Sequence, residues 1–146
     1  MSTKRTIMPR IGIDIGKVIM EPVVGGKADT AFLSGSIEKA METPPSPGAF
    51  EGVKTLVAAF GGRAWPISKA GPNVQRKTKQ WLRHWDFHGI TGLPPEHVRF
   101  CLERPKKAEH CRQLKIAHFI DDRIDVLTAL REDVPYLYVW RAAALG

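Results

Sequence analysis

Acidic residues follow two apolar stretches of this chain, and their positions suit the chemistry of phosphoryl groups. Residues 10–20 read RIGIDIGKVIM, in which Asp14 follows a run of alternating isoleucines. A second apolar stretch, residues 116–120, leads directly into Asp121 and Asp122. Carboxylates at the carboxyl ends of parallel strands lie at the edge where open α/β sheets bind ligands. Such groups could share one Mg²⁺, because hard divalent cations prefer carboxylate and carbonyl oxygens.

Two further polar residues would complete a site for a phosphoryl group. Ser68 ends a strand-like run at residues 63–67 and supplies a hydroxyl, and Lys107 opens a predicted helix and supplies a compact positive charge. A carboxylate nucleophile beside a metal, a lysine and a hydroxyl can accept and transfer a phosphoryl group. Each residue also has a simpler explanation. Asp121 and Asp122 could cap the following helix, and Lys107 could be a solvated helix residue.

The apolar pattern of the chain predicts strands that alternate with helices. Alternating or continuous apolar runs predict strands at residues 10–16, 63–67, 98–102, 116–120 and 135–140. Helical spacing predicts helices at residues 50–60 and at 74–85 with Asn73 as the N-cap, and further helices are predicted at residues 107–114 and 124–130. Such alternation forms parallel βαβ units. We therefore predict that residues 1–146 form one three-layer α/β domain, Rossmann-like, with a parallel sheet of order 3-2-1-4-5.

Two segments between these elements are predicted to lack regular helices. Residues 17–47 have no clean period and are assigned to a flap and linker. Within them, Gly25-Gly26 between apolar groups suggests a small β-hairpin, and a group of prolines precedes Gly48. Residues 89–95 are predicted to form a loop.

The charge balance favours anionic partners. The chain has 146 residues, a formal net charge of +7 and a sequence pI of about 9.7. Phosphorylated small molecules, nucleotides and nucleic acid are all compatible with this balance. A basic cluster follows the second predicted strand, and we interpret it as a solvated helix face rather than a nucleic-acid groove. Its members are Arg76, Lys77, Lys79 and Arg83.

The sequence gives no sign of a membrane segment or a secretory leader. No apolar stretch is long enough to span a bilayer, and residues 1–10 lack the apolar region of a signal peptide. We therefore expect a cytoplasmic protein with no membrane partner. Cys101 and Cys111 lack metal-type spacing, and we expect reduced core thiols rather than a disulfide or a ligand pair.

Four segments occur in the order and context of the four motifs of the haloacid dehalogenase-like (HAD) superfamily, which the chain resembles over almost its whole length. These segments read IGIDIGKVI, WPISK, KKAEHCRQL and FIDDRIDVL. Each motif alone is common, and their order at successive strand–helix junctions is what carries the resemblance. It implies a Mg²⁺-dependent phosphohydrolase that forms an aspartyl-phosphate intermediate with a small phosphate ester or anhydride.

The resemblance implies roles for residues of the first two segments. Asp14 matches the nucleophile, which also binds Mg²⁺, and the carbonyl of Gly16 matches a backbone metal ligand. Ser68 matches the hydroxyl that holds the transferring phosphoryl group. We assign its neighbour Lys69 to the phosphate site as well.

The resemblance also implies roles for the later segments. Lys107 matches the lysine that neutralises charge on the nucleophile and the phosphate, and it has better spacing to Asp121 than its neighbour Lys106. Asp121 and Asp122 match the metal-binding acids, with Asp125 as a supporting residue.

Gly16 departs from the family pattern. Phosphatases of the family usually carry a second aspartate at this position, which protonates the leaving oxygen and later activates water. General acid–base catalysis contributes about 10²–10⁴ in rate, so its loss should favour leaving groups that need little protonation, such as aryl or acyl phosphates. Branches that cleave carbon–halogen or carbon–phosphorus bonds also lack the second acid. The branch that cleaves carbon–halogen bonds acts without metal, which fits poorly with Asp121 and Asp122. Sugar-phosphatase-like members with an Asp-x-Gly-x-Val motif resemble this segment more closely.

Two further hypotheses stay open. Gly16 is compatible with a catalytically weakened phosphate- or nucleotide-binding module. The short spacings from Asp14 to Ser68 and from Ser68 to Lys107 leave no room for the family's large cap domains. An open site and a basic chain are compatible with a nucleic-acid end phosphatase, and equally with a small substrate covered by a partner subunit.

Overall fold

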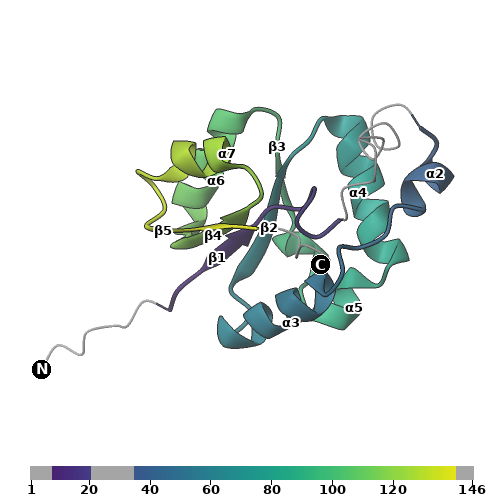
Figure 1. Cartoon of the computed structure of the whole chain (residues 1–146), viewed down its shortest axis with the longest axis horizontal. Coiled ribbons are helices and arrows are strands. Elements are labelled where there is room, and N and C mark those ends of the chain that lie inside the picture. The colour runs from purple at the N-terminus through teal and green to yellow at the C-terminus, as the bar shows by residue number, and fades with distance from the viewer. Residues whose placement is uncertain (1–7, 21–34, 141–146) are drawn as a thin grey trace, which may run out of the picture.

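The centre of the protein is a parallel sheet of five strands in the order β3-β2-β1-β4-β5 (Figure 1). The structure is a computed structural model that describes residues 8–20 and 35–140. Every pair of neighbouring strands is parallel. The predicted α/β class and strand order are confirmed. The strands are β1 (Ile11–Ile13), β2 (Ala64–Lys69), β3 (Arg99–Cys101), β4 (His118–Asp121) and β5 (Tyr136–Val139).

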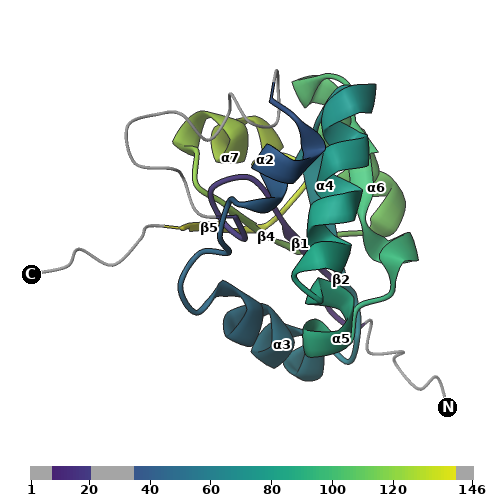
Figure 2. The same ribbon diagram turned by 90° about the vertical axis from the view of Figure 1, so that its right-hand side faces the viewer.

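Helices cover both faces of the sheet, which makes a three-layer, Rossmann-like arrangement (Figure 1). One layer contains α3 (Ala49–Ala59), α4 (Pro72–His84) and α5 (Phe87–Thr91). The opposite layer contains α6 (Arg104–Leu114) and α7 (Ile124–Leu130). The short α2 (Ile37–Met41) lies beside α4, and α3 lies beside α5 (Figure 2). A single 3₁₀ turn, η1 (Pro95–His97), precedes β3.

Each face of the sheet has its own apolar core. On the α3–α5 face, Trp81 and Phe87 are fully buried, and the Trp81 indole Nε1 donates a hydrogen bond to the Thr43 carbonyl at 2.7 Å. On the α6–α7 face, the core includes the fully buried side chains of Phe119 and Leu130. Removal of this apolar surface from water is the main stabilising contribution to such a fold.

A glycine in β1 permits close packing beneath the acidic edge. A Cβ atom added at Gly12 would lie 2.5 Å from Cδ2 of Phe119, far inside van der Waals contact. The absent side chain therefore lets the Phe119 ring of β4 lie against β1. The ammonium of Lys107 lies 5.1 Å from the centre of the same ring.

Several element boundaries differ from the sequence prediction. Helix α4 begins at Pro72 with Gly71 as its N-cap, so the prediction that Asn73 caps this helix is wrong. Proline suits the first helical turn because its φ is already helical and it has no N–H group to leave unpaired. Helix α6 likewise begins at Arg104, so Lys107 lies one turn inside it rather than opening it.

The two segments predicted without helices also contain short ones. The predicted loop at residues 89–95 overlaps the end of α5. This helix begins at the buried Phe87 and ends at Gly92, whose φ is 84°. Helix α2 lies within the predicted flap and linker at residues 17–47. The predicted hairpin around Gly25-Gly26 lies outside the described residues.

Three smaller predictions can be compared with the structure. Cys101 and Cys111 are free and buried, as expected. Lys77, predicted on a solvated face, is instead buried, and its ammonium donates to the Gly35 carbonyl at 2.6 Å. No helix in the described part of the chain has the length and apolar character needed to cross a membrane.

Candidate functional site

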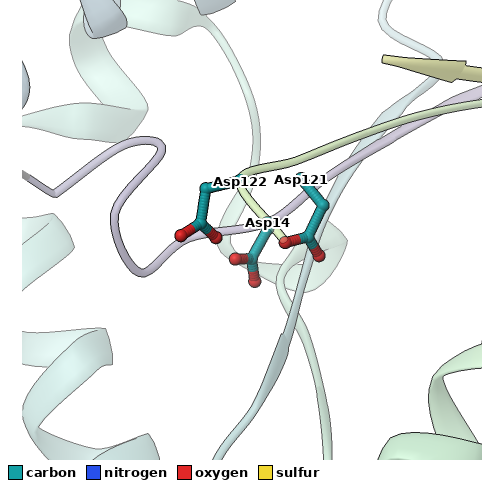
Figure 3. Close-up of side chains that lie close together, drawn as sticks. All are labelled: Asp14, Asp121 and Asp122. Carbon is teal, nitrogen blue, oxygen red and sulfur yellow. The ribbon is translucent and has the colours of Figure 1, made fainter. Parts of the chain in front are cut away.

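The register between β1 and β4 brings the acidic residues to one edge of the sheet. Ile13 pairs with Ile120, and the Asp14 amide donates to the Ile120 carbonyl at 2.9 Å, which continues the ladder past β1. Asp14 is therefore level with Asp121, and Asp122 follows. One carboxylate oxygen from each of the three acids lies within 4.8 Å of the others (Figure 3).

The buried ammonium of Lys107 bonds to two of these carboxylates. Its ammonium donates to Asp14 Oδ1 at 3.2 Å and to Asp121 Oδ2 at 3.0 Å, and its side chain is only 5% exposed. It is therefore not a solvated helix residue. Lys106, the competing lysine, is exposed and pairs with Glu109 at 3.4 Å.

Asp121 is held on both sides of its carboxylate. While Oδ2 accepts from Lys107, Oδ1 accepts from the backbone amide of Arg123 at 3.0 Å. The N-cap position of α7 is Arg123, so neither Asp121 nor Asp122 occupies the capping position. The guanidinium of Arg123 donates to both carboxylate oxygens of Asp125, at 3.1 and 2.9 Å. Asp125 thus orients an arginine at the border of the site.

Strand β2 delivers the hydroxyl and a further lysine to the same edge. Its first half pairs with β1 through residues 64–66, and its second half pairs with β3 through residues 67–69. Pro66 lies at the change of partner, outside the part registered with β3. Ser68 is half-buried and Lys69 is exposed at the end of the strand.

A pocket of about 290 Å³ is lined by every residue predicted to bind metal or phosphate, whereas Asp125, predicted as a supporting residue, does not line it. Its other lining residues were not predicted, although Lys17 and Arg123 stand directly beside predicted positions and could have been found on that ground. The lining residues are Asp14, Gly16, Lys17, Ser68, Lys69, Lys107, Asp121, Asp122, Arg123 and Val126.

The floor of this pocket holds more negative than positive charge. Burial raises the pKa of Asp14 to about 7; Lys107 opposes this rise, and the charges of Asp121 and Asp122 add to it. Burial also raises the pKa of Asp122, together with a hydrogen bond and repulsion from Asp121, although Lys17 lowers it. Burial lowers the pKa of Lys107, but Asp14 and Asp121 outweigh it, and the net pKa is raised. Lys107 therefore stays an ammonium among acids that it does not fully neutralise.

The donor set fits a hard divalent cation. Carboxylate oxygens and a backbone carbonyl are the ligands that Mg²⁺ prefers, and repulsion among the acids is what a cation would relieve. Within residues 8–20 and 35–140, Asp14, Asp121 and Asp122 form the only group of three or more acidic, histidine or cysteine side chains placed to hold a metal. Gly16, predicted to offer its carbonyl, is exposed at the pocket.

Comparison with known proteins does not identify this chain. No protein-family model matches it, and no curated protein matches it in sequence. The fold and the site define a doubly wound α/β protein with a lysine-bridged acidic pocket at the carboxyl edge of its sheet. Its function has to be inferred from that pocket.

Proposed function

We propose that the protein is a Mg²⁺-dependent phosphohydrolase of the HAD type, in which Asp14 accepts the phosphoryl group. The observation that supports this most strongly is one pocket that contains a central carboxylate, a buried lysine bonded to it, two further acids and a hydroxyl. An acidic cluster alone would fit many structural roles. A buried lysine and a serine beside it are what phosphoryl transfer additionally needs.

Asp14 is the nucleophile in this proposal. It follows the last residue of a central strand; the strand ladder fixes its backbone, and Lys107 orients its carboxylate. An oxygen of Asp14 attacks phosphorus, and the bond to the leaving oxygen breaks to give an aspartyl phosphate. Water then hydrolyses that intermediate to release inorganic phosphate. Fixing the nucleophile in advance lowers the entropy cost of the first step.

Lys107, Ser68 and Lys69 bind the transferring group. Lys107 reduces repulsion between Asp14 and a phosphate dianion, because its ammonium already contacts the carboxylate. The half-buried hydroxyl of Ser68 and the exposed ammonium of Lys69 offer donors to the phosphoryl oxygens from the neighbouring strand. Donors held in place before the reaction stabilise the transition state without reorganisation.

Asp14, Asp121, Asp122 and the carbonyl of Gly16 are the groups that would hold Mg²⁺. The bound ion would supply Lewis-acid stabilisation of charge on the phosphoryl oxygens. Asp121 is committed to Lys107 and the Arg123 amide through both of its oxygens. We therefore expect Asp14 and Asp122 to contribute more of the direct metal contacts than Asp121.

The substrate in this proposal is a phosphate ester or anhydride with a good leaving group. Gly16 has no side chain to protonate a departing oxygen, so aryl and acyl phosphates should react faster than alkyl phosphates.

Purified protein should hydrolyse para-nitrophenyl phosphate and acetyl phosphate with Mg²⁺ and not with EDTA. Asp14→Asn, which keeps the side-chain shape, should lose at least about 10³-fold in kcat. Equal rates for wild type and Asp14→Asn over a broad panel of phosphate esters would reject the proposal.

A binding module without turnover is the second candidate, and Gly16 is the observation that favours it. Mg²⁺-dependent binding of inorganic phosphate without turnover would support this candidate. The variant Gly16→Asp sharpens the distinction, since a Cβ at this position meets no atom within 4 Å. A phosphatase that lacks only its acid should gain activity on alkyl phosphates in this variant, whereas a binding module should gain none.

A further inference from the structure

Lys17 lines the pocket directly after Gly16, and none of the roles above uses it. It is exposed, whereas Lys107 is buried at the floor of the same pocket. The two lysines therefore differ in burial within one site. Lys107 contacts the nucleophile, and Lys17 lines the solvent-exposed part of the pocket.

The backbone holds Lys17 in an unusual conformation. Its φ is 64°, in the left-handed region that is unfavourable for a residue other than glycine. The amides of Ile19 and Met20 both donate to the Ile15 carbonyl, at 2.9 and 3.1 Å, and close the turn around it. Such strain is often found where a turn has to present a residue at a functional site.

Lys17 brings a positive charge to the pocket that holds the acids. It lines the same pocket as Asp14 and Asp122, directly after Gly16. Gly16 offers no side chain there, and a Cβ built on it would meet nothing within 4 Å. The pocket is therefore open at the residue that precedes Lys17.

We propose that Lys17 stabilises the negative charge on the leaving oxygen, a role that rests on the proposed phosphohydrolase function. An oxygen of Asp14 attacks phosphorus, the bond from phosphorus to the ester oxygen breaks, and its electron pair remains on that oxygen. The Lys17 ammonium stabilises this charge, and the oxygen then takes a proton from solvent. A positive charge at this position thereby compensates in part for the acid that Gly16 lacks.

This role predicts which substrates depend on Lys17. Charge on the leaving oxygen is largest when the departing alcohol or phenol is weakly acidic. For Lys17→Ala we expect kcat/KM to fall about 100-fold on phenyl phosphate and only about 3-fold on para-nitrophenyl phosphate. Lys17→Arg keeps the charge and should restore most of the lost rate on phenyl phosphate.

Lys115 provides a matched control. It is also an exposed lysine with a left-handed backbone, at φ 54°, but it caps the end of α6 near the start of β4. Lys115→Ala should leave the dependence on the leaving group unchanged. Calorimetric titration of inorganic phosphate with Mg²⁺ gives a readout that is independent of turnover. One phosphate oxygen takes the leaving position, so Lys17→Ala should bind it about 5-fold more weakly, and Lys115→Ala should not.

The outcomes separate this inference from the proposed function. A steeper dependence on leaving-group acidity in Lys17→Ala, restored by Lys17→Arg, is the expected result. An equal loss on all aryl phosphates would limit Lys17 to phosphate binding and overturn the leaving-oxygen role. Wild-type rates in Lys17→Ala would overturn it too, with the proposed function intact. Absence of turnover by the wild-type protein would reject the proposed function and this inference together.

Discussion

Two neighbouring lysines of α6 make ion pairs in opposite surroundings. Lys107 is 5% exposed and joins two carboxylates, whereas Lys106 is 55% exposed and pairs with Glu109 on the surface. The same chemical groups at similar distances are therefore expected to contribute differently to stability. An exposed pair contributes little because water solvates either ion alone, whereas a buried ion cannot lose its partner without a large penalty. The comparison indicates that the pocket floor is where charge is energetically coupled to the fold.

Loss of the buried lysine should have the largest effect on stability. Lys107→Ala leaves Asp14 and Asp121 buried without their shared cation. We expect the free energy of unfolding at neutral pH to fall by about 3 kcal/mol, measured by urea denaturation. Lys107→Ala and Lys106→Ala with the same stability would contradict the assigned difference between the two lysines.

Overpacking of the core beneath the pocket floor should have the next largest effect on stability. Gly12→Ala places a Cβ against the fully buried Phe119 ring, which cannot move without disturbing its neighbours. We expect a loss of about 2 kcal/mol. Gly52→Ala is a suitable control because a Cβ there meets nothing within 4 Å, and its melting temperature should not fall.

The pH dependence of stability should reveal the excess negative charge of the floor. The pKa of Asp14 in the folded protein is about 7, against an ordinary value of 3.8. The folded protein holds the Asp14 proton more tightly than the unfolded chain does. The free energy of unfolding is therefore not reduced by Asp14 below about pH 4, and this stability is lost as the pH rises through 7. Without metal, unfolding free energy should fall by about 1 kcal/mol from pH 6 to pH 8, and Asp14→Asn should reduce that fall. Mg²⁺ should also reduce it, because a cation favours the ionised acids.

The exposed pair should have the smallest effect. Lys106→Ala removes a surface interaction between side chains that are both about half exposed. We expect a change in unfolding free energy of at most about 0.5 kcal/mol, and less in high salt. A loss as large as that of Lys107→Ala would show that exposure does not separate the two residues.

The fold was predictable because its strand–helix alternation follows from local patterns. Apolar runs at residues 10–16 and 116–120 mark β1 and β4, and the predicted helix at residues 124–130 has the bounds of α7. Right-handed crossovers then restrict the order of the strands. Helix starts were less predictable, because prolines near the first turn extended α4 and α6 beyond the residues marked by apolar spacing.

The site was predictable as a set of residue types and less so as a geometry. Asp14 follows β1 and Asp121 ends β4, and the register of these parallel strands makes the two residues meet. The burial of Lys77, by contrast, depends on the Gly35 carbonyl, which comes from a distant segment. Lys17 could have been found from its place beside Gly16, but its left-handed conformation could not, because it follows from the turn closed on Ile15, which no residue type in the sequence signals.

Detection of a phosphorylated Asp14 tests the central claim most directly. Protein incubated with Mg²⁺ and acetyl phosphate, quenched in acid and analysed by peptide mass spectrometry should carry one phosphoryl group on the peptide that contains Asp14. EDTA should abolish the modification, and Asp14→Asn should not acquire it. Mg²⁺-dependent turnover with the phosphoryl group on another residue, or with wild-type activity in Asp14→Asn, would contradict the account.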